Sequence, residues 1–461
     1  MTILDRARRL PETSLMVAAT ALLALLGAAI ALAGDRIAIA APALLLGLLA
    51  ATISPPGAIG ACMLATPFVF DLEQLPRGSF SLLELGILVT VAGYGLHLLL
   101  FSRMSLVNRL QRLIEHIEVV VPAIGIVIAA ATAMIHLADP AYRTESLREV
   151  RLVIIEPILL LGIMLVVFCD RRVRAWAVIC LIGAGTALSG WALLQVMTGS
   201  GVVAATDVER ATASYPHPNN LALFLDRSLL VSLPLALIRP RVVWPWLLVG
   251  AQLGGLMLTF SRGSLLAVAA GVVVMLAILG YRRQILWVIG GTVALVAILL
   301  LVARDRVLDP GGDGHEPTRL ALWRSSVRML RDHPIWGVGP DQFLYAYWRR
   351  YVEPIGWAER YTSHPHNLVL DIWLRLGVIG IASFATLALG LLSMLRQIWK
   401  QGQDDWLVRG SLVALAGAVV HGMVDNSFFL ADLATLTWLF VAIIATTYAT
   451  TIRRNAVADE A

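Results

Sequence analysis

The feature that most limits how this chain can fold is a succession of apolar runs, most of them long enough to cross a lipid bilayer. They lie near residues 14–34, 37–54, 56–70, 80–101, 118–138, 150–169, 175–198, 219–238, 243–260, 263–280, 284–303, 367–395, 407–424 and 433–451. A helix needs about 20 apolar residues to span, because its backbone polar groups must be paired within the hydrocarbon. Pro55 and Pro56 separate two short runs, so either run could be half of a broken helix. The sequence therefore predicts an all-α polytopic membrane protein with about 12 to 14 transmembrane helices.

The composition agrees with this class. Hydrophobic residues make up 58% of the chain and charged residues only 15%, which excludes a soluble globular protein. The net charge of +5 is carried almost wholly by arginine, since Lys400 is the only lysine. Arginine suits phosphate groups because its planar guanidinium can donate two hydrogen bonds to the oxygens of one phosphate. We therefore expect the lipid bilayer and phosphate-bearing ligands as partners, and no nucleic acid.

Arginine and lysine in the short connecting loops predict the orientation of the chain. Cytoplasmic loops of bacterial membrane proteins retain these residues, and placing the N-terminus in the cytoplasm puts most of them on that side. The loops concerned include Arg6, Arg8, Arg9, Arg103, Arg109, Arg112, Arg171, Arg172, Arg174, Arg453 and Arg454. Both termini are thus predicted to be cytoplasmic.

The same reading divides the chain into five segments. These are N-terminal transmembrane helices (1–205), transmembrane helices with the Arg210 loop and a Ser-Arg-Gly motif (206–303), a long outer loop (304–366), C-terminal transmembrane helices (367–452) and a cytoplasmic tail (453–461). Within the outer loop, the stretch from Thr318 to Asp332 has amphipathic helical spacing, with Leu320, Trp323, Val327 and Leu330 on one face. Such a helix is expected to lie along the outer headgroup layer.

Three polar clusters interrupt the outer ends of these spans, and the first runs from Arg210 to Asn220. Its prolines hold the chain extended, and Asn219 or Asn220 can cap the helix that follows. Arg210 could fork onto phosphate oxygens, although a loop arginine in the headgroup layer would look the same.

The second cluster, Thr259 to Gly263, is a tight break between two apolar runs. An arginine at such a place is costly unless it is paired or reaches the interface, so we interpret Arg262 as functional. Ser261 lacks the GxSxG context of a nucleophile, which favours a helix cap.

The third cluster is His364-Pro-His366-Asn367, at the end of the long loop. A histidine there can act as a general base near neutral pH, whereas a single histidine would more often be structural. The two histidines lack the helical i, i+4 spacing and an adjacent carboxylate, so zinc is not expected. Asp71 and Glu73, in another outer loop, could hold a cation, but we favour the arginines and assign no metal and no cofactor.

Four further polar residues lie within apolar runs: Glu156, Asp226, His421 and Asp425. Such residues often mark a pathway or a site. We expect helix-to-helix hydrogen bonds for most of them.

Taken together, these motifs resemble the O-antigen ligase and O-antigen polymerase family of bacterial membrane proteins. The similarity rests on the Arg210 to Asn220 loop, on Ser261-Arg262-Gly263, and on Arg319 and Trp323 leading into residues 334–343. Its most specific element is His366-Asn367 followed after nine residues by Gly377-Val-Ile-Gly380. The similarity covers roughly residues 205–430.

The resemblance implies a GT-C-like glycosyltransferase of the bacterial inner membrane, with a periplasmic loop over its cavity. Family members take a glycan from undecaprenyl diphosphate and transfer it to lipid A-core or to another glycan. We predict that Arg210 and Arg262 hold the diphosphate and that His366 is the base of an inverting, metal-independent transfer. We assign supporting positions to His364, His217, Arg319, Asn367 and Ser261.

Alternatives remain open from the sequence. Within the family, the chain could be an O-antigen ligase or an O-antigen or exopolysaccharide polymerase. A transporter or flippase of lipid-linked sugar would also need many spans and a basic cavity, although no internal repeat supports one. A non-catalytic anchoring subunit would use the long loop for docking.

Overall fold

The computed structural model describes residues 12–33, 37–70, 72–75, 78–101, 111–205, 208–238, 240–291, 315–402 and 405–459. Within these ranges the chain is mainly helical, and eight helices are long and apolar enough to cross a membrane. Four shorter apolar helices accompany them. The predicted run 284–303 is described only to residue 291, inside a helix that begins at residue 282. The all-α membrane class is confirmed.

The apolar helices follow the predicted runs closely. In chain order, the helices that fall on the predicted runs are α2 (Glu12–Ala33), α3 (Ile37–Ile53), α4 (Pro55–Ala65), α5 (Leu82–Leu100), α7 (Ile117–Ile135), α9 (Glu156–Val167), α10 (Arg171–Thr198), α11 (Pro218–Ile238), α12 (Val243–Met257), α13 (Arg262–Ile278), α18 (Leu368–Lys400), α19 (Trp406–Gly422) and α20 (Ala431–Asp459); α4 is the short one that is not counted among the twelve apolar helices. Helix α9 continues upstream through a π turn, η3 (Val150–Ile155), into α8 (Arg143–Glu149), and the 3-10 turn η2 (Pro140–Tyr142) precedes α8. Another 3-10 turn, η1 (Thr66–Phe68), follows α4.

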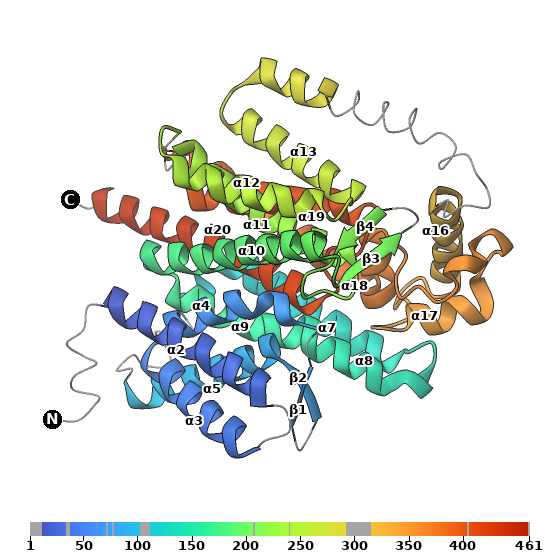
Figure 1. The fold of residues 1–461 in the computed structure, drawn as a ribbon, viewed down its shortest axis with the longest axis horizontal. Helices are drawn as coiled ribbons and strands as arrows, with labels where there is room; N and C mark the ends of the chain where they lie inside the picture. The colour runs from blue at the N-terminus through green and yellow to red at the C-terminus, as the bar shows by residue number, and fades with distance from the viewer. Residues whose placement is uncertain are drawn as a thin grey trace.

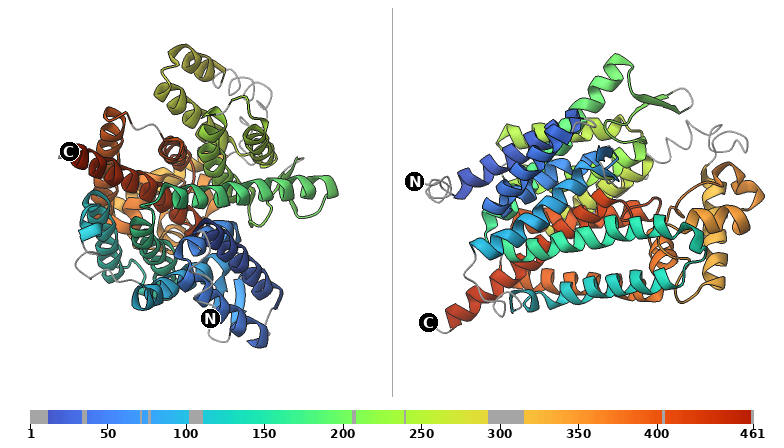
Figure 2. Two further views of the ribbon diagram at one scale, coloured as in Figure 1. Left: turned by 90° about the vertical axis from the view of Figure 1, so that its left-hand side faces the viewer. Right: turned by 90° about the horizontal axis from the view of Figure 1, so that it is seen from below.

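The helices form one bundle with two distinct ends (Figure 1). The beginning of α2 and the end of α20 lie at one end, and two views at right angles agree on this (Figure 2). The opposite end carries α16 (His315–Asp332), α17 (Phe343–Ala346), the π turn η4 (Tyr347–Tyr351) and the 3-10 turn η5 (Pro354–Glu359). Helix α20 is the most enclosed of the long helices, and its Trp438 and Phe440 side chains are fully buried. The bundle is thus built around α20.

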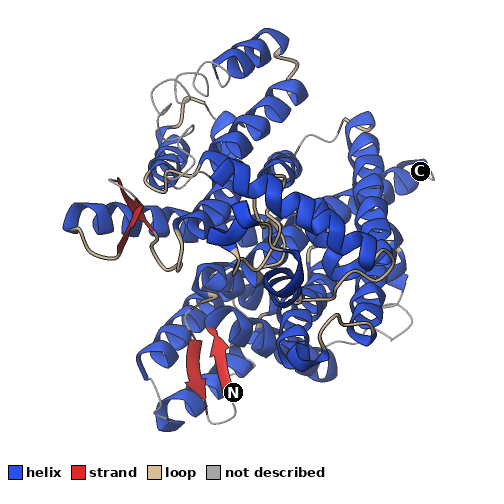
Figure 3. Cartoon of the chain, turned by 90° about the vertical axis from the view of Figure 1, so that its right-hand side faces the viewer, coloured by secondary structure: helices blue, strands red, loops and turns tan. Residues whose placement is uncertain are grey.

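Two short antiparallel hairpins interrupt the helical pattern (Figure 3). The first pairs β1 (Leu72–Leu75) with β2 (Gly78–Ser81), and the second pairs β3 (Val202–Ala205) with β4 (Val208–Ala211). Neither hairpin was predicted. The second matters for the site, because Arg210 lies on β4 and pairs with Val203 instead of lying in an irregular loop.

Helix α16 confirms the predicted amphipathic helix, and part of the apolar face named from the sequence stays exposed. Leu320 is 53% exposed and Val327 is 41% exposed, whereas Leu322 and Met329 are fully buried. The buried residues form a small separate core with α17, η4 and Leu374 of α18. Packing against these elements, and not apolar content alone, decides which face of α16 is covered.

Helix α18 is kinked in its first third at Gly377, which has a left-handed φ of +63°. The segment before α17 docks into this kink: Val338 N donates to Leu374 O at 2.7 Å, and Val378 N donates to Ile335 O at 2.9 Å. A methyl group at position 377 would overlap the Ile335 carbonyl oxygen. The glycine therefore opens the helix so that the outer loop can pair with its backbone.

Candidate functional site

The histidine cluster lies on the loop that leads into α18. Asn367 caps this helix, since its Oδ1 accepts from Val369 N and Leu370 N at 3.1 Å each. His366 has a left-handed φ of +51°, which is uncommon for a residue other than glycine. This turn directs the His366 ring back toward His364, and their ring centroids lie 4.2 Å apart.

Two side chains hold the histidine loop from either side. Trp323 of α16 donates from Nε1 to Pro365 O at 3.1 Å. Arg375 of α18 donates from Nη2 to Ser363 O at 3.0 Å, and its Nε donates to Asp371 at 2.7 Å. Arg375 also pairs with Glu149 at the end of α8. The conformation of the loop thus depends on three separate helices.

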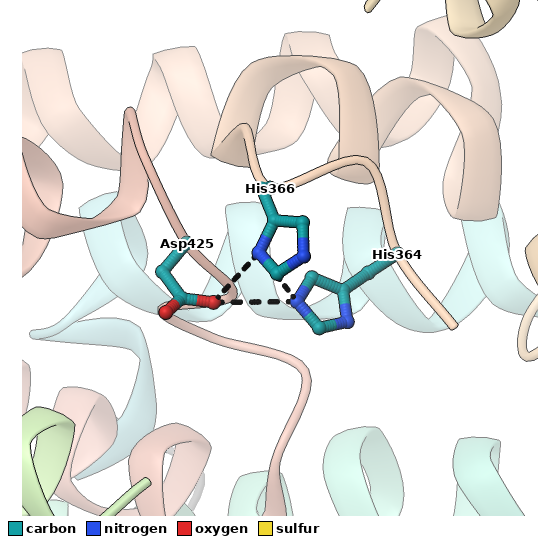
Figure 4. A group of neighbouring side chains, drawn as sticks. All are labelled: His364, His366 and Asp425. Atoms are coloured by element: carbon teal, nitrogen blue, oxygen red, sulfur yellow. Dashed lines mark hydrogen bonds and ion pairs between the residues drawn. The ribbon is translucent and has the colours of Figure 1, made fainter. Parts of the chain in front are cut away.

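Asp425 meets both histidines (Figure 4). This residue lies between α19 and α20, and its Oδ1 is 3.0 Å from His366 Nδ1 and 3.3 Å from His364 Nε2. The two histidine nitrogens are themselves 3.2 Å apart. Only 9% of the Asp425 side chain is exposed, against 18% for His364 and 16% for His366. A buried carboxylate therefore faces a partly open pair of imidazoles.

Arg210 reaches the same cluster through Asn219. Its Nη2 donates to Asn219 Oδ1 at 2.7 Å, and Asn219 Nδ2 donates to Asp425 Oδ2 at 3.3 Å. The Nε of Arg210 donates to Thr259 O at 2.7 Å, next to the Ser-Arg-Gly motif. Asn219, which with Asn220 was expected as a possible helix cap, lies inside α11 because this helix begins at Pro218. The backbone N–H of Asn219 donates to His217 Nδ1 at 3.1 Å.

Arg262 begins α13 beside Arg210. Ser261 caps this helix, as predicted, by accepting from Ser264 N at 3.4 Å. The Arg262 side chain is exposed. The adjacent Gly263 allows α13 to approach α19, because a Cβ atom there would lie 2.6 Å from His421 Nε2. The motif thus combines an exposed arginine, Arg262, with a close contact between α13 and α19 at Gly263.

Buried hydrogen bonds beside the site support the Asp425 loop. His421 Nδ1 lies 2.5 Å from Asp226 Oδ2, and the neighbouring Arg227 donates from Nη2 to Ser427 O at 2.7 Å. These contacts join α11 to α19 and to the segment that carries Asp425. Asp226 and His421 therefore make the expected helix-to-helix hydrogen bond, whereas Asp425 belongs to the site.

The electrostatics of the cluster follow from burial and from neighbouring charge. Burial lowers the pKa of Arg210, and the positive charge of Arg262 lowers it further. Burial also lowers the pKa of His364, with His366 adding to the effect. Burial would raise the pKa of Asp425, but hydrogen bonds from His364 and His366 outweigh it and hold this pKa well below its usual range. The cluster thus combines two adjacent guanidinium groups with an ionised carboxylate.

The other residues assigned from the sequence are more dispersed. His217 is exposed, and it accepts a hydrogen bond from Asn219 N. Arg319 is half-buried on α16 and makes no hydrogen bond or ion pair with a described residue. Glu156 pairs with Arg151, which also pairs with the buried Glu84. Asp71 lies outside the described residues, as does the Glu73 side chain.

Asn219 and Asp425 are the site residues that the sequence did not assign a role. Asn219 was considered as a cap and Asp425 as one of several intramembrane polar residues. Asp425-Asn426 directly follows the apolar run of α19, and the other clusters likewise lie at the ends of apolar runs. A polar residue at the end of an apolar run was therefore the sequence signal that could have identified Asp425 as a site residue.

Comparison with known proteins supports the resemblance read from the motifs. Residues 247–385 match the sequence profile of the O-Antigen ligase family. Over 142 residues the chain is 30% identical to the O-antigen ligase of Salmonella typhimurium. This match covers 28% of the present chain and 34% of the relative, so the similarity spans about a third of that protein. Arg262, His366 and Gly377 fall within the profile match, whereas Arg210, Asn219 and Asp425 fall outside it.

Proposed function

We propose, on the premise that residues 247–385 form a domain of the O-antigen ligase family, that this chain is a membrane glycosyltransferase of lipopolysaccharide biosynthesis. It would transfer a glycan from undecaprenyl diphosphate to a hydroxyl of lipid A-core on the periplasmic face. The observation that carries the proposal is the continuous set of contacts from Arg210 through Asn219 and Asp425 to His366. They support the proposal because they connect the arginine proposed to bind phosphate with the histidine proposed to accept the proton.

Arg210 and Arg262 bind the donor diphosphate in this proposal. Burial lowers the pKa of Arg210, and repulsion by the positive charge of Arg262 lowers it further. A diphosphate against both guanidinium groups would remove the repulsion and accept charge-assisted hydrogen bonds. The same contacts strengthen as negative charge grows on the leaving group, so they stabilise the transition state.

His366 accepts the proton. Asp425 lies against Nδ1 of His366, which leaves Nε2 as the basic atom. Nε2 lies 3.9 Å from a carboxylate oxygen of Glu359, and the His366 side chain is 16% exposed. Asp425 orients the ring and stabilises the imidazolium that forms.

The reaction is a single displacement. The acceptor oxygen forms a bond to the anomeric carbon as the bond from that carbon to the phosphate oxygen breaks. The proton of the acceptor moves to His366, and undecaprenyl diphosphate leaves with the bonding electron pair. Attack from the opposite face inverts the anomeric carbon. Because the arginines neutralise the diphosphate, transfer proceeds without a metal ion.

An apolar cavity near the site offers room for the lipid chain. It has a volume of about 620 Å³ and is lined by residues of α2, α3, α4 and α5 and by Phe68 of η1. Pro67, next to Phe68, accepts a hydrogen bond from Ser214 at 2.7 Å, four residues after Arg210. A polyprenyl chain in this cavity would therefore end close to the loop that carries the diphosphate site.

The proposal places the protein in the bacterial inner membrane, with both termini in the cytoplasm and the site on the periplasmic face. The beginning of α2 and the end of α20 lie at the bundle end opposite α16 and α17, which supports this arrangement (Figure 2). The donor, the lipid A-core acceptor and the bilayer are its partners.

The central test is transfer by the purified protein. In nanodiscs with undecaprenyl-diphosphate glycan and lipid A-core, wild-type protein should release undecaprenyl diphosphate and form the joined product. His366→Ala should lower turnover at least about 100-fold because the base is lost. The matched control is His333→Ala, a half-buried histidine at the end of α16.

Other outcomes separate the rival functions. Chain growth with donor alone would identify a polymerase. Movement of intact donor across liposome membranes without bond formation would identify a flippase. A His366→Ala protein with wild-type turnover would remove the proposed base.

A further inference from the structure

The His364, His366 and Asp425 side chains present three potential ligand atoms toward one point (Figure 4). The three distances among Asp425 Oδ1, His366 Nδ1 and His364 Nε2 are 3.0, 3.2 and 3.3 Å. Zinc binds nitrogen and oxygen at about 2.0–2.1 Å in a tetrahedron, whose ligand atoms are then about 3.3 Å apart. The three atoms thus approximate one face of a zinc tetrahedron. The sequence argument against zinc rested on the spacing of the two histidines and on the lack of an adjacent carboxylate, and Asp425 removes the second ground.

Hydrogen bonds alone cannot satisfy all three contacts. A carboxylate oxygen only accepts, and each histidine nitrogen either donates or accepts. If both nitrogens donate to Asp425, they face each other as two donors. If either nitrogen is unprotonated, its lone pair faces the carboxylate oxygen. A cation at the centre would meet three lone pairs at once.

The surroundings suit a bound ion. His364 Nδ1 lies 3.1 Å from Ser363 Oγ, and Asp425 Oδ2 accepts from Asn219 at 3.3 Å, so two ligands have outer partners that fix their orientation. The left-handed turn at His366 brings its Nδ1 to the common point. Both histidines are partly exposed, which leaves a fourth coordination position open.

We propose that His364, His366 and Asp425 form a binding site for Zn²⁺, and that its occupation inhibits glycan transfer. Two imidazoles and one carboxylate are a ligand set typical of zinc. The inhibition rests on the proposed function, in which His366 accepts a proton at Nε2. A divalent ion on Nδ1 displaces the Asp425 contact and places positive charge on the same ring, so the ring no longer gains a proton readily. The binding itself does not depend on the function.

Binding is tested with Co²⁺ as the probe on full-length protein in nanodiscs after treatment with EDTA. Wild-type protein should show the intense visible absorption of tetrahedral Co²⁺, and Zn²⁺ should abolish it. His364→Gln and Asp425→Asn should each weaken Co²⁺ binding by about 100-fold, because the affinity depends on each ligand. His333→Gln is the matched control and should bind as wild type does. Thermal unfolding without metal checks that each variant is folded. Equal affinity in the wild type and both ligand variants would overturn the site.

Inhibition is tested in the transfer assay on the same samples. Zn²⁺ that saturates the site should reduce wild-type turnover at least tenfold, and EDTA should restore it. The residual turnover of His364→Gln should not respond to the same Zn²⁺ concentration. Full turnover with zinc bound would overturn the inhibition. Absence of transfer in EDTA-treated wild type that binds Co²⁺ would instead contradict the proposed function and leave the metal site standing.

Discussion

Asn219 is the residue that joins the two halves of the site. Its amide oxygen accepts from Arg210 and its amide nitrogen donates to Asp425, so one side chain fixes both a cation and a carboxylate. An amide can do this because it carries an acceptor and donors on the same plane. Asparagine therefore cannot be replaced here by a residue with only one of these functions.

Asn219→Ala should raise the KM for the lipid-linked donor about tenfold, with a smaller change in kcat. The loss of one hydrogen bond to a charged group is worth about 1.5 kcal/mol, which corresponds to this factor. Steady-state kinetics at fixed acceptor concentration measure it. Asn220→Ala, at the next position of α11, is the matched control. An unchanged KM for the donor in Asn219→Ala would show that Asn219 does not position Arg210.

Arg262→Lys should lower turnover by about 100-fold, nearly as much as Arg262→Ala. Lysine keeps the positive charge but lacks the planar guanidinium that donates two hydrogen bonds to phosphate oxygens. Loss of one hydrogen bond to the transition state lowers turnover by about 100-fold. Arg331→Lys, an exposed arginine on α16, provides the control. Turnover of Arg262→Lys close to that of the wild type would mean that charge alone suffices.

At the scale of elements, the kink in α18 connects the outer loop to the bundle. Gly377 breaks the helical backbone, so the Leu374 carbonyl becomes free to accept from Val338 N and Gly339 N. Gly337, also left-handed, lies against the same carbonyl. The glycine signature after His366 is thus a docking point for the loop.

Gly377→Ala should lower the free energy of unfolding by more than the strain of a left-handed alanine alone. That strain is about 1–2 kcal/mol, and the new methyl group would also overlap the Ile335 carbonyl. Gly402→Ala is the matched control, since Gly402 is also left-handed, with φ of +67°, but has open space. Thermal unfolding in detergent compares the two variants. Equal losses of unfolding free energy in the two variants would show that docking of the loop at Gly377 contributes nothing to stability.

At the scale of the whole molecule, the two bundle ends differ in what they carry. One end holds the beginning of α2 and the end of α20, and the other holds the hairpin β3–β4, α16 and the histidine loop (Figure 1). A glycan donor presented on the periplasmic face requires the second end to face outward. The orientation of the chain is therefore a direct consequence of the proposed function.

Cysteine labelling tests this orientation. Cys169 is exposed just before α10, whereas Ser200 is exposed just after that helix, so the predicted topology puts the two on opposite sides of the membrane. A membrane-impermeant maleimide added to intact spheroplasts should label Ser200→Cys and leave Cys169 unlabelled until the cells are lysed. Cys62 and Cys180 are buried and serve as internal controls. The reverse labelling pattern would contradict the predicted topology.

The sequence by itself determined the membrane class, the helix positions and the family resemblance. Hydrocarbon leaves the backbone few alternatives to the helix, so apolar runs are sufficient to locate it. Caps such as Ser261 and Asn367 were also predictable, because they act within four residues. Only the tertiary structure decided that Asp425 meets His366 across 59 positions of sequence. Such contacts depend on how helices pack around α20, and no local pattern encodes that arrangement.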